Sequence, residues 1–140
     1  KEILGDYIFS RNSSVRNGYI ENITTDCFYG MDIYKYLKIY FVNVLQDNVS
    51  SDIRLLHILY EHKICMLSRI KYLSDNKYLA EASSIIKAYS EIEKIALMLR
   101  NLQLSYNSKG DKKILQRMIN YIDLIADKEA GVLLKLLEKL

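Results

Sequence analysis

Residues 53–73, IRLLHILYEHKICMLSRIKYL, carry the clearest structural signal in the chain. Their apolar side chains recur three or four residues apart, which is the period of an α-helix. They form two stripes, the first made of Ile53, Leu56, Tyr60, Ile64 and Leu67 and the second of Leu55, Leu59, Met66 and Ile70. A helix that is apolar over so wide an arc packs on more than one side. This segment therefore predicts a helix enclosed by other helices.

The helical period continues on both sides of this segment. A first helix is expected from about Asp32, an acid suited to the first turn, to the break at Asp47-Asn48, with apolar residues at Ile33, Leu37, Tyr40, Phe41 and Val44. A third is expected over 77–104, with an inner face of Leu79, Ala82, Ile86, Tyr89, Ala96 and Leu99. A fourth is expected over 111–137, with Leu115, Met118, Ile122, Ile125, Leu133 and Leu136 facing inward.

Polar residues between these segments predict the loops and helix caps. Ser50, Ser51 and Asp52 can cap the second helix, because their side chains accept hydrogen bonds from the first turn. Residues 106–110 form a polar loop, and Ser108 within it and Asp111 just after it, three residues apart, resemble a capping box. Long helices joined by short loops are typical of antiparallel neighbours. We therefore expect an all-α fold, a four-helix up-down bundle over residues 31–140.

Residues 1–30 differ from the rest of the chain and predict an N-terminal arm. The stretches 6–10 and 18–22 look extended, and turn-forming residues separate them. Asn17-Gly18 favours a short hairpin. Because two short strands alone are marginally stable in water, an irregular arm lying across the helices is the preferred interpretation.

Composition narrows the class of protein. The chain has 140 residues, the length of one domain or of a piece of a larger chain, and contains no proline, which suits long uninterrupted helices. Its apolar runs are far shorter than the roughly 20 residues of a membrane span, so no membrane contact is expected. With 20 basic and 17 acidic residues interspersed, it lacks the basic stripe of a nucleic-acid binder. A cytoplasmic protein is expected.

No metal, cofactor or catalytic residue is expected from the motifs. Cys27 and Cys65 match no metal-binding spacing, and buried or semi-buried thiols without a disulfide, in a reducing cytosol, are expected. His57 and His62 are five residues apart on one helix, so their side chains point about 140° apart and cannot easily share a metal. Cys65 and His62 share a helix face, but a catalytic thiolate usually lies at a helix N-terminus or on a loop. The scattered glycines exclude a phosphate-binding loop.

Two charged residues interrupt the apolar stripes. Glu129 is in register with Ile125 and Leu133, on the face expected to be buried, and Arg69 lies near the apolar side of the second helix. A buried carboxylate needs a partner. Among His62, Lys63 and Arg69, we expect Glu129 to pair with Arg69 or His62. The alternative is that the end of the fourth helix turns Glu129 toward solvent.

The first helix carries the candidate interaction surface. Tyr34, Tyr36 and Tyr40 lie within one eight-residue segment, YKYLKIYF. Tyrosine is enriched in protein interfaces, and this segment is the expected partner surface. Packing within the core is the alternative explanation for these rings.

The order of these features resembles a known family. A helix over 30–45 precedes one with His62-Lys63, Arg69 and Leu73, then one with Tyr89, and finally one with Glu129 before a Leu-rich end. This order is similar to the helical C-terminal region of the butirosin biosynthesis protein H family, over roughly residues 28–137. In that family the catalytic Cys and His lie in a papain-like N-terminal domain, and some members transfer acyl groups from a carrier protein to an amine. The resemblance implies a non-catalytic part of a larger protein, with Lys1 marking a cut.

Three classes of function follow. The first is a non-catalytic accessory domain that packs against another domain of such a biosynthetic protein. The second is a stand-alone helical adaptor or regulatory protein, with a homodimer among its forms. The third is a ligand binder or small enzyme, which a cavity with Glu129 or His62 at its wall would favour.

Overall fold

The computed structural model describes residues 1–16, 18 and 27–140. Four long helices make up most of this part: α3 (Ile33–Leu45), α4 (Arg54–Asp75), α5 (Ser83–Lys109) and α6 (Lys112–Lys139). They are preceded by the short helices α1 (Glu2–Ile8) and α2 (Ser13–Arg16) and by the 3-10 helix η1 (Gly30–Asp32). No strand occurs among these residues, so the predicted all-α class is confirmed.

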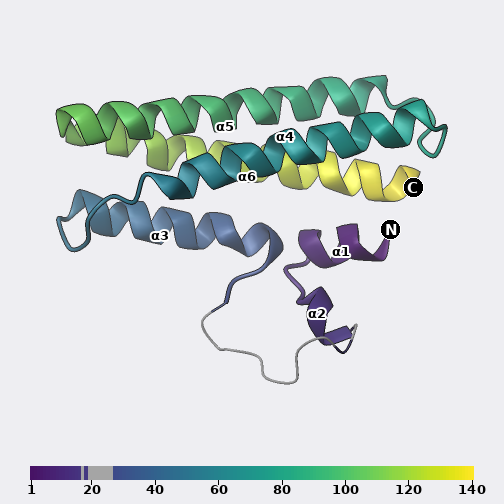
Figure 1. Ribbon diagram of the computed structural model, residues 1–140, viewed down its shortest axis with the longest axis horizontal. Helices are drawn as coiled ribbons and strands as arrows, with labels where there is room; N and C mark the ends of the chain where they lie inside the picture. Colours follow the sequence, from purple (N-terminus) through teal and green to yellow (C-terminus); the bar gives the residue numbers. More distant parts are fainter. Residues whose placement is uncertain (17, 19–26) are drawn as a thin grey trace.

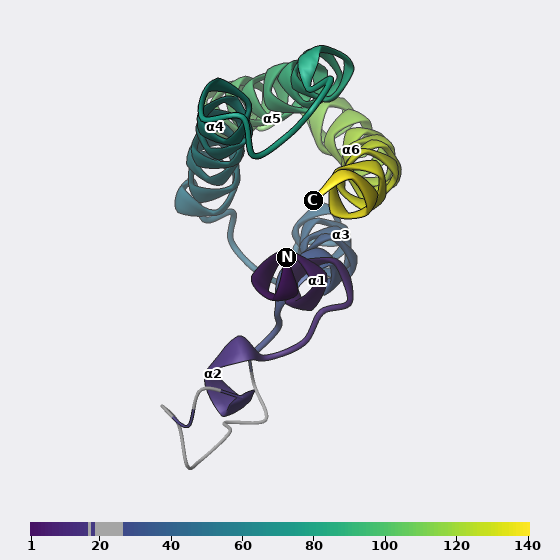
Figure 2. The ribbon, with the colours of Figure 1, turned by 90° about the vertical axis from the view of Figure 1, so that its right-hand side faces the viewer.

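The long helices lie side by side in an order that differs from their order in the sequence. Figure 1 shows each long helix running back along the one before it. Viewed from the end in Figure 2, the helices follow an arc in the order α4, α5, α6 and α3. The packing agrees with this view, because α5 lies against α4 and α6, and α3 lies against α6. α3 and α4 therefore stand at the two ends of the arc, and α1 lies beside α6 and η1.

The core is built from the inner faces of all four long helices. In α6 the predicted inward positions are all buried, namely Leu115, Met118, Ile122, Ile125, Leu133 and Leu136. In α4 the prediction of two buried stripes is wrong, because the helix buries one face, while Ile64 and Ile53, the residue just before the helix, are exposed. The buried face of α4 consists of Leu56, Leu59, Lys63, Met66, Leu67 and Ile70. An end helix of an arc has a neighbour on one side only, which explains the narrower face.

The connection between α4 and α5 is longer than predicted. Residues 77–82, expected to be helical, form turns in which Lys77 and Glu81 have φ angles of 62° and 50°. The Tyr78 N–H donates to the Leu73 carbonyl at 2.9 Å, a bond that wraps the chain around the end of α4. Leu79 is 3% exposed, so the loop is fastened to the core by its own apolar side chain.

The connection between α5 and α6 is shorter than predicted. α5 continues to Lys109, and Gly110, with a φ of 68°, ends it in the left-handed conformation that glycine adopts readily. Asp111 caps α6 by accepting a hydrogen bond from the Lys113 N–H at 2.9 Å. Ser108 belongs to α5, so the predicted capping box reduces to Asp111 alone. At α4 the Asp52 carboxylate accepts from the Arg54 N–H at 3.0 Å, but the N-cap position itself is Ile53, which makes no side-chain capping bond.

The described part of the N-terminal arm contains two short helices, α1 and α2, with turns and irregular segments around them. The stretch 6–10 was expected to be extended, but Asp6, Tyr7 and Ile8 complete α1. The end of α1 closely approaches Gly30, where an added Cβ atom would lie 2.0 Å from the Tyr7 carbonyl oxygen. Only glycine allows this contact, and Gly30 also has a φ of 56°. Apart from Gly18, the predicted hairpin at Asn17-Gly18 and the stretch 18–22 fall outside the described residues.

Candidate functional site

A buried ion pair joins α4 to α6 in the middle of the core. The Lys63 Nζ lies 2.9 Å from the Glu129 Oε1 and 2.8 Å from its Oε2. Both side chains are 0% exposed. Removing two charges from water is costly, and the cost is recovered only when further hydrogen bonds satisfy the buried atoms.

Two tyrosines supply those further hydrogen bonds. Tyr34 of α3 donates its hydroxyl to the Glu129 Oε2, and Tyr89 of α5 donates to the Oε1. Each carboxylate oxygen therefore accepts from one tyrosine and from Lys63. We call Tyr34, Lys63, Tyr89 and Glu129 the polar hub. Each long helix contributes one of its residues, so the hub ties all four helices together.

The short helix α1 covers the hub on its outer side. Lys63 donates to the Tyr7 hydroxyl at 3.0 Å, and its Nζ lies 3.3 Å from the His62 Nδ1. The rings of Tyr7 and His62 stack, with centroids 5.3 Å apart. Lys63 thus has an anionic partner within the core and two neutral ring partners toward the surface.

Burial determines the protonation of the hub. It raises the pKa of the Tyr34 and Tyr89 hydroxyls, and the charge of Glu129 raises both further. Both tyrosines therefore remain donors at neutral pH. Burial lowers the pKa of Lys63, while Glu129 acts in the opposite direction. Burial and then the charge of Lys63 lower the pKa of His62 to about 4, so its ring is neutral at pH 7.

The partner of Glu129 differs from the prediction. Glu129 is 0% exposed, so the alternative that it turns toward solvent is wrong. Its partner is Lys63 rather than Arg69 or His62. Arg69 is exposed, with its Nη1 atom 4.0 Å from the Met66 Sδ. Lys63 follows Leu59 by four residues and is at the centre of the buried face of α4, which is the signal that sequence reasoning missed.

The three tyrosines proposed as one interaction surface lie in different places. Tyr34 is 3% exposed and belongs to the hub, so its assignment to the surface is wrong. Tyr36 is half-buried and stacks on Phe28. Tyr40 is half-buried and fastens the loop before α4, donating to the Ser50 carbonyl at 2.7 Å and accepting from the Asp52 N–H at 2.6 Å.

Two apolar pockets lie on either side of the stacked Tyr7 and His62, which line both. We call the first the α3–α4 groove. It has a volume of about 330 Å³, and its apolar lining is Ile33, Leu37, Leu55, Ile58 and Leu59. We call the second the α1–α4 pocket. It has a volume of about 310 Å³, and its apolar lining includes Leu4, Met66, Ile70, Leu73 and Leu136. The groove lies between α3 and α4, whereas the pocket lies between α1, α4 and the end of α6.

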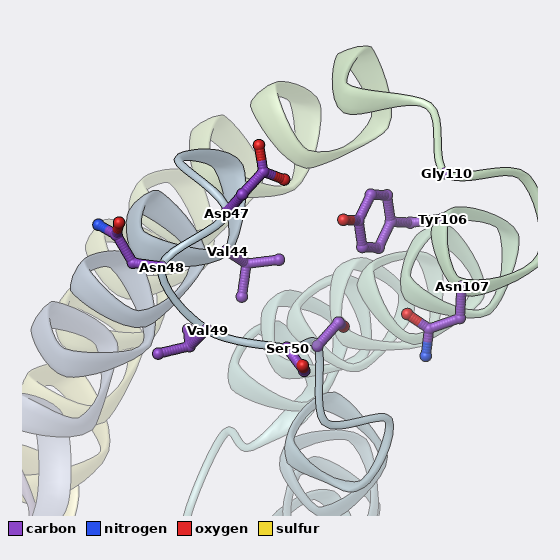
Figure 3. A pocket seen from close by; sticks show the side chains of 9 residues that line it. Val44, Asp47, Asn48, Val49, Ser50, Tyr106, Asn107 and Gly110 are labelled. Carbon is purple, nitrogen blue, oxygen red and sulfur yellow. The ribbon is translucent and has the colours of Figure 1, made fainter.

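A third hollow, shown in Figure 3, lies at the opposite end of the long helices from α1. It has a volume of about 560 Å³ and lies between the α3–α4 loop and the end of α5. Its lining is mostly polar and includes Asp47, Asn48, Ser50, Ser51, Tyr106 and Asn107. The Asp47 carboxylate is paired with Lys112. This hollow is larger than the other two, but it is remote from the hub and from His62.

The structure also bears on metal binding, on the two cysteines and on membrane-spanning helices. In the described part of the chain, no three His, Cys, Asp or Glu side chains gather closely enough to hold a metal ion. Cys27 and Cys65 form no disulfide, but both are exposed, so the expectation of buried or semi-buried thiols is wrong. Within residues 1–16 and 27–140, no helix combines the length and the apolar character that crossing a membrane requires.

Comparison with family models, with curated proteins and with solved structures finds no match to this chain. Its function must therefore be argued from the polar hub and from the pockets around Tyr7 and His62.

Proposed function

We propose that this chain is a non-catalytic helical accessory domain that docks on another protein domain through the α3–α4 groove. The observation that carries the proposal is the apolar surface at this groove. Ile33 and Ile58 line it and remain 40% and 59% exposed, respectively. Burying such a side chain against a partner is favourable by about 25 cal/mol for each Å² of apolar surface removed from water.

The architecture supports this proposal. We interpret the helices as a four-helix up-down bundle in which the contact between the first and last members of the arc is incomplete. α5 and α6 each have a helix on both sides, whereas α3 and α4 each have a free flank. A partner seated in the groove would supply the missing contact for both helices.

The polar hub supports a structural role for the ionisable residues in the core. Lys63 and Glu129 neutralise each other, and the hydroxyls of Tyr34 and Tyr89 are committed to the same carboxylate. Groups bound to each other in this way hold helices in register instead of meeting a substrate.

For the partner, we propose the catalytic domain of a cytoplasmic biosynthetic protein that takes acyl groups from a carrier protein. The order of Gly30, His62-Lys63, Tyr89 and Glu129 along the helices supports this choice through its family resemblance. The alternative is a stand-alone adaptor or homodimer that uses the same groove for a different partner.

Site-specific cross-linking tests the proposal. A photoreactive phenylalanine replaces Ile58 in the chromosomal copy, and the products of irradiated cells are identified by their mass and peptides. The control carries the same group at Leu104 of α5, which is 41% exposed but does not line the groove. We expect position 58 to cross-link to a papain-like domain and position 104 not to do so.

The other outcomes discriminate between the alternatives. A cross-link between two copies of this chain, of 16.4 kDa each, would support the homodimer and overturn the accessory-domain proposal. Equal cross-linking from positions 58 and 104, or none from position 58, would contradict docking through the groove.

A further inference from the structure

The α1–α4 pocket combines an apolar interior with a cationic rim. Its aliphatic walls come from three helices, with Leu4 from α1, Met66 and Ile70 from α4, and Leu136 from α6. The charged side chains that line it, Lys1 and Arg69, are both basic. Among the residues that the structure describes, no acidic side chain lines this pocket.

Arg69 is placed to meet a ligand at the rim. Its Nη1 atom lies 4.0 Å from the Sδ atom of Met66, which lines the same pocket. Among the described residues, no carboxylate lies within ion-pair distance of its guanidinium, whereas Arg54 on the same helix is paired with Asp52. An unpaired guanidinium presents donors in the fork geometry that suits a carboxylate.

We propose that the α1–α4 pocket binds a free single-chain carboxylate, with the chain among Leu4, Met66 and Leu136 and the carboxylate on Arg69. A volume of about 310 Å³ is at the lower end of the range for ligand pockets and fits one short chain better than a ring system. The cationic rim selects an anion over an alcohol or an amine.

This inference is independent of the docking proposal. The stacked rings of Tyr7 and His62 stand between the α1–α4 pocket and the α3–α4 groove. Ile33 and Ile58 line the groove but not the pocket, whereas Met66 and Arg69 line the pocket but not the groove. A failure of one proposal therefore leaves the other standing.

Titration calorimetry with octanoate tests the inference, with octanol and octylamine as charge controls. Hexanoate and heptanoate measure the contribution of the chain, because each buried methylene is expected to tighten binding about fourfold. We expect octylamine to bind at least about tenfold more weakly than octanoate, since it loses the charge-assisted hydrogen bonds and meets like charge.

Two variants locate the site. Arg69→Gln should weaken octanoate binding about tenfold, while the matched control Arg117→Gln, also exposed but outside the pocket, should leave it unchanged. Leu73→Trp should abolish binding by filling the pocket. Circular dichroism and a urea titration confirm that each variant is folded, and Arg69→Gln alters a surface residue whose loss the fold tolerates.

Three results would overturn the inference. They are no heat of binding at millimolar octanoate, equal binding of octanoate and octylamine, and octanoate binding that neither Arg69→Gln nor Leu73→Trp reduces. Co-flotation with anionic phospholipid vesicles without any octanoate binding would also overturn it. The anion that Lys1 and Arg69 meet would then be a membrane surface and not a free carboxylate.

Discussion

The two sides of the helical arc are completed in different ways. On the side of α5 and α6, each helix packs against a helix on either flank, and residues such as Ile92 and Leu115 are fully buried. On the side where α3 and α4 stand apart, the seven-residue helix α1 inserts Tyr7, and Ile33 and Ile58 remain exposed. The first side buries its apolar surface within the chain, whereas the second leaves apolar surface for a ligand or a partner.

The polar hub lies where the two sides meet. Its tyrosines come from α3 and α5, its charges from α4 and α6, and Tyr7 covers it from the open side. Apolar contacts alone tolerate small shifts of one helix along another. Because a buried carboxylate must keep all its hydrogen bonds, the hub opposes such shifts even where α3 and α4 lack direct packing.

The largest predicted effect is the loss of the hub cation. Lys63→Met leaves the Glu129 carboxylate buried without a counter-charge, and we expect the free energy of unfolding to fall by about 3–5 kcal/mol. Urea titration followed by circular dichroism measures the change. The matched control Lys38→Met removes a lysine from an exposed pair with Asp123 and should cost less than about 1 kcal/mol. Equal effects of the two substitutions would refute the burial argument.

A smaller loss is expected from removal of one hub hydroxyl. Tyr89→Phe keeps the ring in the core but removes a donor to the carboxylate, at an expected cost of about 1.5–3 kcal/mol. The control is Tyr78→Phe on the α4–α5 loop, where the side chain is 67% exposed and the change should be within about 0.5 kcal/mol. Unchanged stability of Tyr89→Phe would mean that its hydroxyl does not support Glu129.

The pH dependence of the free energy of unfolding reports on the surroundings of His62. Its pKa is about 4 in the folded protein and about 6.5 in the unfolded chain, so between these values the unfolded chain binds more protons. Stability should be fully present above pH 6.5 and decline as the pH falls toward 4. The melting temperature is measured across this pH range. The decline should be absent in His62→Gln and remain in His57→Gln, which alters an exposed ring. The effect is moderate because His62 is only half-buried.

The smallest predicted effect is a gain of stability. Gly131 lies inside α6 with no neighbouring atom within 4 Å of an added Cβ, so it serves no close helix crossing. Gly131→Ala should raise the free energy of unfolding by up to about 1 kcal/mol, because alanine loses less backbone entropy in a helix. At Gly30 the same substitution should be destabilising, since the added atom meets the Tyr7 backbone. A loss of stability at Gly131 would reveal a packing role that the structure does not show.

Much of the fold could be predicted because helical periodicity is a local signal. The four long helices occur close to where the apolar period placed them, and every residue predicted to face inward from α6 is buried, although the buried Ile114 and Ile119 were missed. The errors fall where tertiary contacts outweigh local preference. Residues 77–82 leave the helix because Leu79 docks on the core, and residues 6–8 become helical where Tyr7 reaches Lys63.

The site could be predicted only in part, because pairing across a bundle depends on helix order and rotation. Glu129 was recognised as a charge in a buried register. Its partner was missed because Lys63 was not tested against the buried face of α4 in the same way. Tyr34 was taken for a surface residue, since a tyrosine pattern does not reveal whether a buried carboxylate faces the hydroxyl. The two pockets beside Tyr7 depend on how α1 and α3 are placed against α4, which no local pattern encodes.

A double-mutant cycle between Lys63 and Glu129 tests the buried hub most directly. The free energy of unfolding is measured by urea titration for Lys63→Met, for Glu129→Leu, for the double variant and for the unaltered chain. We expect the double variant to be more stable than Lys63→Met, with a coupling energy of at least about 2 kcal/mol, because removing both charges leaves no buried ion. Additive effects, with a coupling energy near zero, would contradict an ion pair in the core.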